Sequence, residues 1–164
     1  MGIQQHRDAL QRRTSALLAA TVKAGTNITA NRKQWTHAQG SVMIWLYDGG
    51  SDFGSCAGDK EGWFKVNQMG PWGSNLNSEN WGTAIVLKRL KWSSKIPSNV
   101  KTGNYLVRHE PLAPHQANTP QFYAECAQLV VEGGGTAQPP LSFLKNIPGY
   151  ASRKDPGIIV CSFG

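Results

Sequence analysis

The chain has 164 residues, enough for one domain with a buried core, and none of its apolar runs approaches the roughly 20 residues of a transmembrane helix, so we expect no membrane partner. Its net charge is +7, but the 17 Lys and Arg residues are scattered and form no run interleaved with aromatic residues, so nucleic-acid binding is not indicated. The 18 Gly and 9 Pro residues, with only 16% charged residues, favour an all-β chain with many turns over a helical one.

The N-terminal region predicts a loop followed by two short strands. Residues 1–18 contain no apolar segment ahead of a small-residue cleavage site, so they do not resemble a secretory signal. Their arginines and leucines could also form a short amphipathic helix. Residues 19–24 and a segment beginning at Asn27 are expected to be strands on either side of a turn at Gly25, an order of elements that a family resemblance in the later motifs implies.

Residues 42–47 form the clearest buried strand of the first half. Apolar residues occupy both alternating sets of positions, which is typical of a strand covered on both faces and therefore central in a sandwich. His37 lies just before this strand. Taken alone, a histidine at such a position more often caps a loop and makes local hydrogen bonds than binds a metal.

The middle of the chain predicts several more strands and one long loop. We expect strands at residues 62–66, 85–90 and 92–96, and a loop rich in Gly, Asn and Trp at residues 69–81. Trp72, in a Gly-Pro-Trp-Gly turn of this loop, is a candidate platform for sugar stacking, because an indole face offers a large apolar area to a pyranose ring. Trp63, Trp81 and Trp92 could serve in the same way, but most of them are expected to be in the core.

Two strands near residues 104–110 and 123–131 are joined by a proline-rich connection. The period-2 alternation of both segments indicates strands. A proline lacks the N–H that a strand ladder needs, so the connection is predicted to be an ordered loop; its prolines are Pro111, Pro114 and Pro120. A last strand is expected at residues 156–163.

The same connection carries polar side chains of the kinds that surround metal ions. It contains His115 and leads to Gln121 and Tyr123, which an antiparallel pair of strands would bring to one edge of a sandwich. An imidazole, an amide and a phenol there form either the wall of a metal site or three hydrogen-bonded polar groups without a ligand.

Three spaced motifs carry a family resemblance. The run GNYLVRHE…LAPHQA…PQFYAECAQLVVEGGG, with WTHAQGSVMIWL before it and IPGYASRKDPGI after it, closely resembles the fungal copper-dependent lytic polysaccharide monooxygenases of auxiliary-activity family nine. The resemblance covers roughly residues 21–160 and is weaker in its first third. Together with the strand pattern it implies an all-β chain, an antiparallel immunoglobulin- or fibronectin-like β-sandwich with long loops, in a single domain over residues 1–164.

The resemblance also implies an activity. Such enzymes are extracellular and use one copper ion, with electrons from an external donor, to oxidise cellulose or a related β-1,4-glucan. Copper is held by the N-terminal amino group, the side chain of an N-terminal histidine and a second histidine, with a tyrosine oxygen in a long axial position. We expect a monomeric protein with these partners.

Individual roles follow where the motifs match. His37 matches the second histidine ligand, although Ser41 stands where the family has a proline, and Tyr123 matches the axial tyrosine. His115 and Gln121 match the pair that hydrogen-bonds the oxygen species beside the metal without binding the metal itself. Prolines in the connection depart from the family pattern and affect the orientation of His115.

The N-terminus departs from the family as well. The chain starts with Met1-Gly2, and His6 is internal, so we expect an N-terminally incomplete domain that binds copper far more loosely than a full ligand set. A copper-dependent enzyme, a non-catalytic copper- or glucan-binding sandwich and an inactive truncated relative all remain as hypotheses.

The cysteines number three, Cys56, Cys126 and Cys161, so they cannot all pair within the chain. Their spacing matches no zinc motif. In the family the usual partner of Cys126 lies in N-terminal sequence that this chain does not have, so we expect the Cys126 sulfur to be a thiol.

Overall fold

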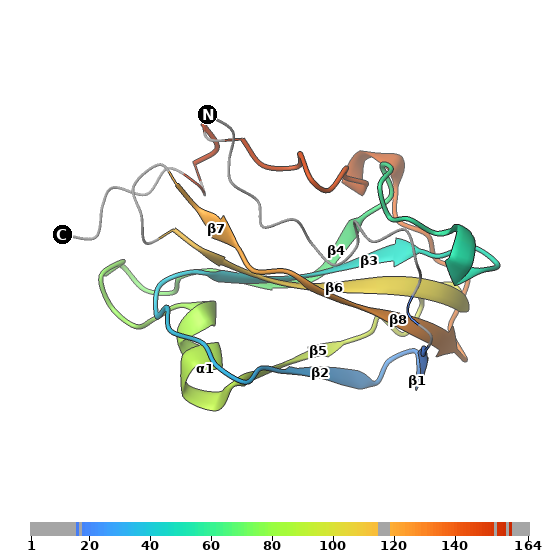
Figure 1. Ribbon diagram of the computed structural model, residues 1–164, viewed down its shortest axis with the longest axis horizontal. Coiled ribbons are helices and arrows are strands. Elements are labelled where there is room, and N and C mark those ends of the chain that lie inside the picture. Colours follow the sequence, from blue (N-terminus) through green and yellow to red (C-terminus); the bar gives the residue numbers. More distant parts are fainter. Residues whose placement is uncertain (1–15, 17, 115–118, 153, 157, 159–164) are drawn as a thin grey trace.

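The computed structural model of the chain (Figure 1) describes residue 16, residues 18–114, 119–152 and 154–156, and residue 158. His115, Cys161 and nearly all of the N-terminal segment lie outside the described residues. The strands are β1 (Ala20–Lys23), β2 (Asn27–Asn31), β3 (Ser41–Asp48), β4 (Phe64–Met69), β5 (Lys91–Lys95), β6 (Gly103–Ala113), β7 (Gln121–Phe122) and β8 (Glu125–Glu132). In the described part of the chain the helices are α1 (Gly82–Arg89) and two short 3₁₀ turns, η2 (Phe53–Ser55) and η3 (Leu141–Phe143).

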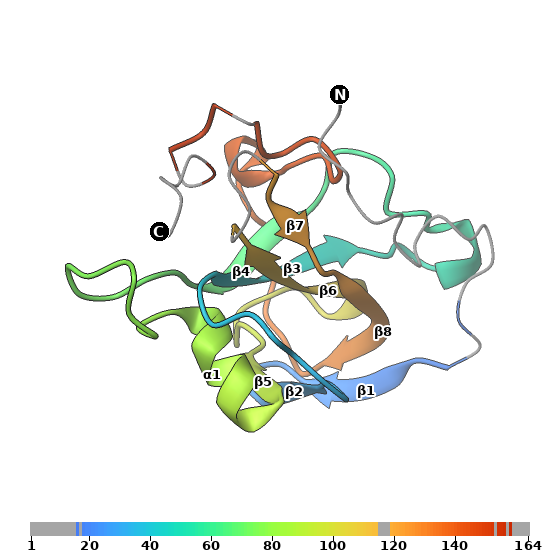
Figure 2. The same ribbon diagram turned by 60° about the vertical axis from the view of Figure 1, so that its left-hand side comes forward.

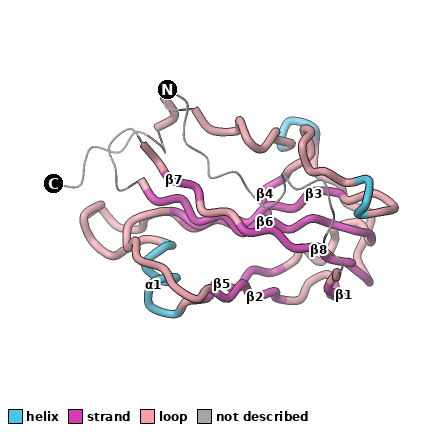
Figure 3. Tube along the Cα trace, viewed as in Figure 1, coloured by secondary structure: helices cyan, strands magenta, loops and turns pink. Residues whose placement is uncertain are grey.

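The strands form two layers, which confirms the predicted β-sandwich. The larger sheet has the order β1-β8-β6-β3-β4, with β7 paired to β6, and the smaller sheet contains β2 and β5. All pairs are antiparallel except β1 with β8. Figures 1 and 3 show β2 and β5 running beneath the large sheet, with long loops at both ends. Among the described helices, none is long and apolar enough to cross a membrane.

Strand β3 is central, as its sequence predicts, because both of its faces are covered. Val42, Ile44 and Leu46 belong to the core between the layers, which also contains Trp92 of β5. Met43 and Trp45 point to the opposite face and belong to a second core cluster with Trp63 and Ile147. A strand buried on both faces has apolar residues at every position, which explains the continuous run.

A buried ion pair lies on that opposite face. Arg108 Nε donates to Glu110 Oε2 at 2.7 Å, and the Tyr150 hydroxyl donates to the other carboxylate oxygen. Arg108 is 4% exposed and Glu110 is fully buried. Burial and the adjacent carboxylate raise the pKa of the Tyr150 phenol, so it stays protonated. The carboxylate thus has charged and neutral donors inside the protein.

The prediction of a strand at residues 85–90 was wrong. This segment lies in α1, which packs at one end of the small sheet (Figure 2). A short apolar run fits helix and strand periods equally well, and here the helical period buries Ala84 and Val86. Leu90 ends the helix in the left-handed conformation with φ of 51°, and its N–H donates to Val86 O at 2.7 Å.

The expected loop start at Pro111 was also wrong, because β6 continues through it to Ala113. Pro111 pairs with Val42 of β3, and its carbonyl accepts the Tyr123 N–H at 2.9 Å. In an antiparallel ladder the N–H and C=O of one residue face the same neighbour. The absent N–H therefore faces Tyr123 in the break between β7 and β8, where the Tyr123 carbonyl oxygen accepts from Arg32 Nη2 at 3.1 Å instead.

Other boundaries differ less. The predicted strand at 62–66 is shifted to β4, and that at 123–131 starts at Glu125, so Tyr123 lies in the break before β8. The described residues of the predicted strand 156–163 are Pro156 and Ile158, and both lie in turns.

Candidate metal centre

The break between β7 and β8 brings Tyr123 to His37, which precedes β3. His37 Nε2 and the Tyr123 hydroxyl oxygen lie 3.0 Å apart, although the residues are 86 positions apart in the sequence. The Tyr123 hydroxyl donates to Gln121 Oε1. A phenol has one proton, so the contact with His37 is donated by an Nε2–H tautomer. The structure therefore places three of the predicted site residues together.

Trp35 forms the inner wall of this site. Its indole edge packs against the His37 ring at a centroid distance of 5.3 Å and against the Tyr123 ring at 5.0 Å, both at 85°. The indole N–H also donates to the His37 carbonyl oxygen at 2.6 Å. Trp35 is buried, so it holds both rings from the core side and excludes water there. The packing role of Trp35 was not predicted from the sequence. The available signal was its position two residues before His37, a candidate metal ligand.

The electrostatics of the site keep Tyr123 neutral. Burial raises the pKa of its phenol above the ordinary value of 10.0. A protonated phenol is a weak metal donor, so its oxygen fits a position at a long distance from a metal ion better than a short metal–oxygen bond. A metal at His37 Nε2 would displace the proton of that nitrogen, because an imidazole nitrogen binds metals only through its lone pair.

The donor set fits copper in kind. Imidazole nitrogen is a favoured copper(II) donor, and copper has the highest affinity of the common divalent ions for such ligands. Within the described ranges no group of three or more His, Cys, Asp and Glu side chains could hold a metal ion. His37 and Tyr123 are the two predicted metal ligands that the structure places in contact, and His115 falls among the residues that are not described.

Trp72 lies apart from this pair, in the loop between β4 and α1. It is 43% exposed, and its backbone N–H donates to Asn80 O at 2.9 Å, which ties the turn to the end of the loop. Trp63, Trp81 and Trp92 are buried, as expected for core residues. An exposed indole on a braced turn retains the property that a sugar-stacking residue needs.

The two described cysteines form no disulfide with each other. Cys56 follows η2, where burial raises the pKa of its thiol, and Cys126 lies in β8. Cys161 is not among the described residues.

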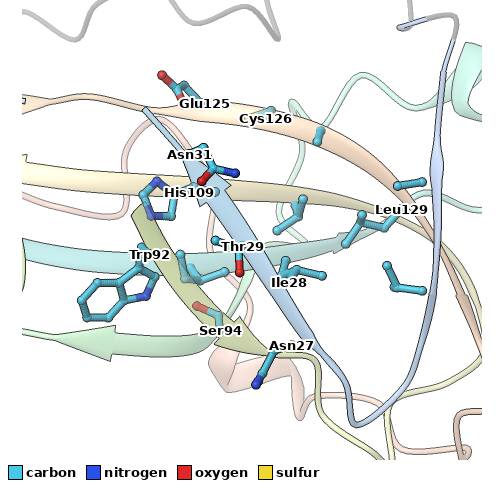
Figure 4. A pocket seen from close by; sticks show the side chains of 16 residues that line it. Asn27, Ile28, Thr29, Asn31, Trp92, Ser94, His109, Glu125, Cys126 and Leu129 are labelled. Atoms are coloured by element: carbon cyan, nitrogen blue, oxygen red, sulfur yellow. The ribbon is translucent and has the colours of Figure 1, made fainter. Parts of the chain in front are cut away.

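A pocket of about 530 Å³ opens between the two sheets. Figure 4 shows side chains of β2, β5, β6 and β8 around it, among them Ser94, His109 and Cys126. His109 is 6% exposed, and its Nδ1 lies 3.3 Å from Nη2 of Arg32. Burial and the Arg32 charge lower the pKa of His109 to about 4, so the ring is neutral at ordinary pH. His109 alternates with Tyr105 and Val107 on the inward face of β6. This pattern in the sequence could have indicated that His109 is buried.

Comparison with known proteins places these residues in a described family. Residues 4–163 match the family model described as Auxiliary Activity family 9 (formerly GH61). The chain is 48% identical over 153 residues to AA9 family lytic polysaccharide monooxygenase D of Thermothelomyces thermophilus, and 45% identical over 145 residues to monooxygenase B of the same family from Heterobasidion irregulare. These alignments cover 88% of the chain but only 60% and 59% of the relatives.

Solved structures agree. The crystal structure of a cellulose-active polysaccharide monooxygenase from M. thermophila superposes with a TM-score of 0.84 at 47% identity, covering 89% of this chain and 68% of that one. The chain thus spans about three fifths of the length of these curated relatives.

Proposed function

Because the chain belongs to Auxiliary Activity family 9, formerly GH61, we propose that it is the greater part of a copper-dependent lytic polysaccharide monooxygenase that oxidises cellulose or a related β-1,4-glucan. The observation that carries the proposal is the 3.0 Å contact between His37 Nε2 and the Tyr123 hydroxyl, which comes from two distant motifs inside the matched region. The solved relative described as cellulose-active supports the substrate class.

In this proposal His37 supplies an imidazole nitrogen to copper and Tyr123 a weak phenol oxygen. Bound copper supplies the redox chemistry by which dioxygen or peroxide, with an external electron donor, oxidises a glucan carbon. Gln121 Oε1 accepts a hydrogen bond from the Tyr123 hydroxyl and so orients the phenol oxygen toward His37. His115 is proposed to hydrogen-bond the oxidant beside it.

Trp35 fixes the orientation of the two donors and keeps water from their inner side. Positioning of this kind matters because a metal ligand that rotates freely loses affinity, and groups behind the ligands commonly tune a metal site. Trp72 is proposed to stack on the glucan. A single domain, a monomeric state and an extracellular location are part of the same proposal.

The test is a copper titration followed by a cellulose assay, with the protein at the length in which its source produces it. His37→Ala is expected to weaken Cu(II) binding by orders of magnitude in calorimetry and to abolish oxidised oligosaccharides released from cellulose with a reductant. Gln34→Ala, an exposed neighbour in the same loop, is the matched control and should change neither.

Two outcomes would contradict the proposal in different ways. Unchanged copper affinity in His37→Ala would remove the metal site from this position. Tight copper binding by the unmutated protein without oxidation of any glucan would favour a non-catalytic copper- or glucan-binding sandwich, which the partial donor set of the described residues also fits.

A further inference from the structure

We propose that Arg32 is a positioning residue for the His37–Tyr123 pair, holding the backbone of Tyr123 and the ring of Trp35 from the side of the core. The inference rests on the proposed function, because it concerns the same site. Arg32 itself does not touch the ligand atoms of the site.

The first contact is with the backbone of Tyr123. Arg32 Nη2 donates to the Tyr123 carbonyl oxygen at 3.1 Å. Tyr123 lies in the break between β7 and β8, where the only ladder-like bond described for it is its N–H to Pro111 O at 2.9 Å. The Arg32 guanidinium therefore supplies a second hydrogen bond to the Tyr123 main chain, at a position that lies outside the strands β7 and β8.

The second contact is with Trp35. The guanidinium carbon of Arg32 lies 5.5 Å from the centroid of the indole ring, within range of a cation–π interaction. The same indole packs edge-on against both His37 and Tyr123 and binds the His37 carbonyl. One side chain thus reaches both members of the pair, one through its backbone and one through the shared aromatic wall.

Arg32 is itself held in place. Its backbone N–H donates to Leu90 O at 2.8 Å, next to the end of α1. Its Nη1 donates to Glu125 Oε1 at 3.3 Å, and Nη2 also contacts Nδ1 of the neutral His109 at 3.3 Å. The Arg32 side chain is 8% exposed, so these partners surround a nearly buried cation.

Stability alone is a poor reason for this arrangement. Burial lowers the pKa of Arg32, with Glu125 opposing that effect, and Nε has no hydrogen-bond partner in the part of the chain that the structure describes. A nearly buried cation is costly to desolvate, and its pairing with the largely exposed Glu125 adds little net stability, especially when one polar atom of Arg32 is left unsatisfied. A planar guanidinium can reach a carbonyl, an imidazole, a carboxylate and an aromatic face from one position, which an ammonium cannot do.

The test uses Arg32→Met, which keeps the aliphatic stem, and Arg32→Lys, which keeps the charge but loses the planar fork. Arg89→Met, an exposed arginine in the last turn of α1, is the matched control. In metal-free protein, NMR should show displaced His37 ring nitrogen and Tyr123 amide signals in both Arg32 variants but not in the control. Cu(II) affinity should fall about 10- to 100-fold, with altered electron paramagnetic resonance parameters.

A merely structural role predicts something else: a lower Tm with native His37 and Tyr123 signals, or full restoration of those signals by Arg32→Lys. Either result would overturn the proposal. If Arg32→Met fails to fold, Glu125→Gln removes one anchor of Arg32 at a side chain that is 58% exposed, and displaced His37 and Tyr123 signals are then still expected. The NMR readout needs no metal, so it can succeed or fail independently of the monooxygenase proposal, which the copper and cellulose assays decide.

Discussion

At the scale of the residue, His109 and Arg32 show how burial decides which protonation state a side chain keeps. His109 faces a cation and a pocket wall, so protonation would place two positive charges together in a poorly solvated space. Its pKa falls from 6.5 to about 4 for this reason, with desolvation the larger cause and Arg32 the smaller. The neutral ring can then accept a hydrogen bond from Arg32 Nη2 at Nδ1.

This shift predicts a pH dependence of folding stability. The unfolded chain binds a proton at position 109 below about pH 6.5 and the folded chain only near pH 4, so stability contributed by the neutral ring is lost as pH falls through this window. The full loss is about 3 kcal/mol, because each pKa unit corresponds to about 1.4 kcal/mol. Urea unfolding at pH 4 to 8 should show this slope, and His109→Asn should flatten it. Equal slopes in both proteins would contradict the assigned pKa.

At the scale of the element, α1 and the end of β6 show how local backbone geometry sets boundaries near the site. The end of α1 places Leu90 O where it accepts the Arg32 N–H, and the break after β7 places Tyr123 beside Pro111. Both boundaries depend on residues with unusual backbone properties, one with a positive φ and one without an N–H. The candidate metal centre is thus built at the ends of elements and not within them.

Leu90 provides a test of this view of α1. A non-glycine residue in the left-handed conformation costs roughly 1 kcal/mol, but Leu90 is only 37% exposed, so removing its side chain also loses packing. Leu90→Ala and Leu90→Gly lose the same packing, so Leu90→Gly is expected to have the higher free energy of unfolding of the two, by about 0.5–1 kcal/mol in urea titrations.

Lys91→Gly, one position later in the extended strand β5, is the matched control and should lower stability, since glycine in a strand loses more entropy on folding. A Leu90→Gly variant no more stable than Leu90→Ala would mean that the left-handed conformation at position 90 carries no strain.

At the scale of the whole molecule, the two layers are unequal. The large sheet covers both core clusters, whereas the small sheet consists of β2 and β5 alone among the described strands and has the pocket on its inner side. Few strands and an incompletely filled interface both lower the free energy needed to open a region locally. The layer that carries Arg32 at its end is therefore expected to be the more easily opened one.

Hydrogen exchange followed by mass spectrometry measures this difference directly. Amides of β2 should exchange at least roughly tenfold faster than those of β6, which is paired on both sides. Peptides from β8, which lies in the same large sheet as β6 and is also paired on both sides, serve as the reference. Protection of β2 equal to that of β6 would show that the small layer unfolds only with the whole domain.

The sequence by itself determined the fold class and the central strand. Period-2 patterns at β3, β6 and β8 and the turn-forming residues between them predict an antiparallel sandwich, and the spaced motifs indicate the family. Such signals are local, because side-chain alternation and turn chemistry depend on neighbouring residues. The family motifs also selected His37, Gln121 and Tyr123, which the structure brings together.

Only the tertiary structure decided the rest. The run at residues 85–90 fits helix and strand equally, and its packing beside β5 selects the helix. Pro111 extends β6 because its absent N–H faces a break that is visible only once β7 and β8 are placed. Arg32 acquires its role from contacts with His109 and Tyr123, which lie 77 and 91 positions away in the sequence. Trp35 acquires its role from ring packing against Tyr123. Contacts of that range depend on how the two sheets pack, and no local pattern encodes them.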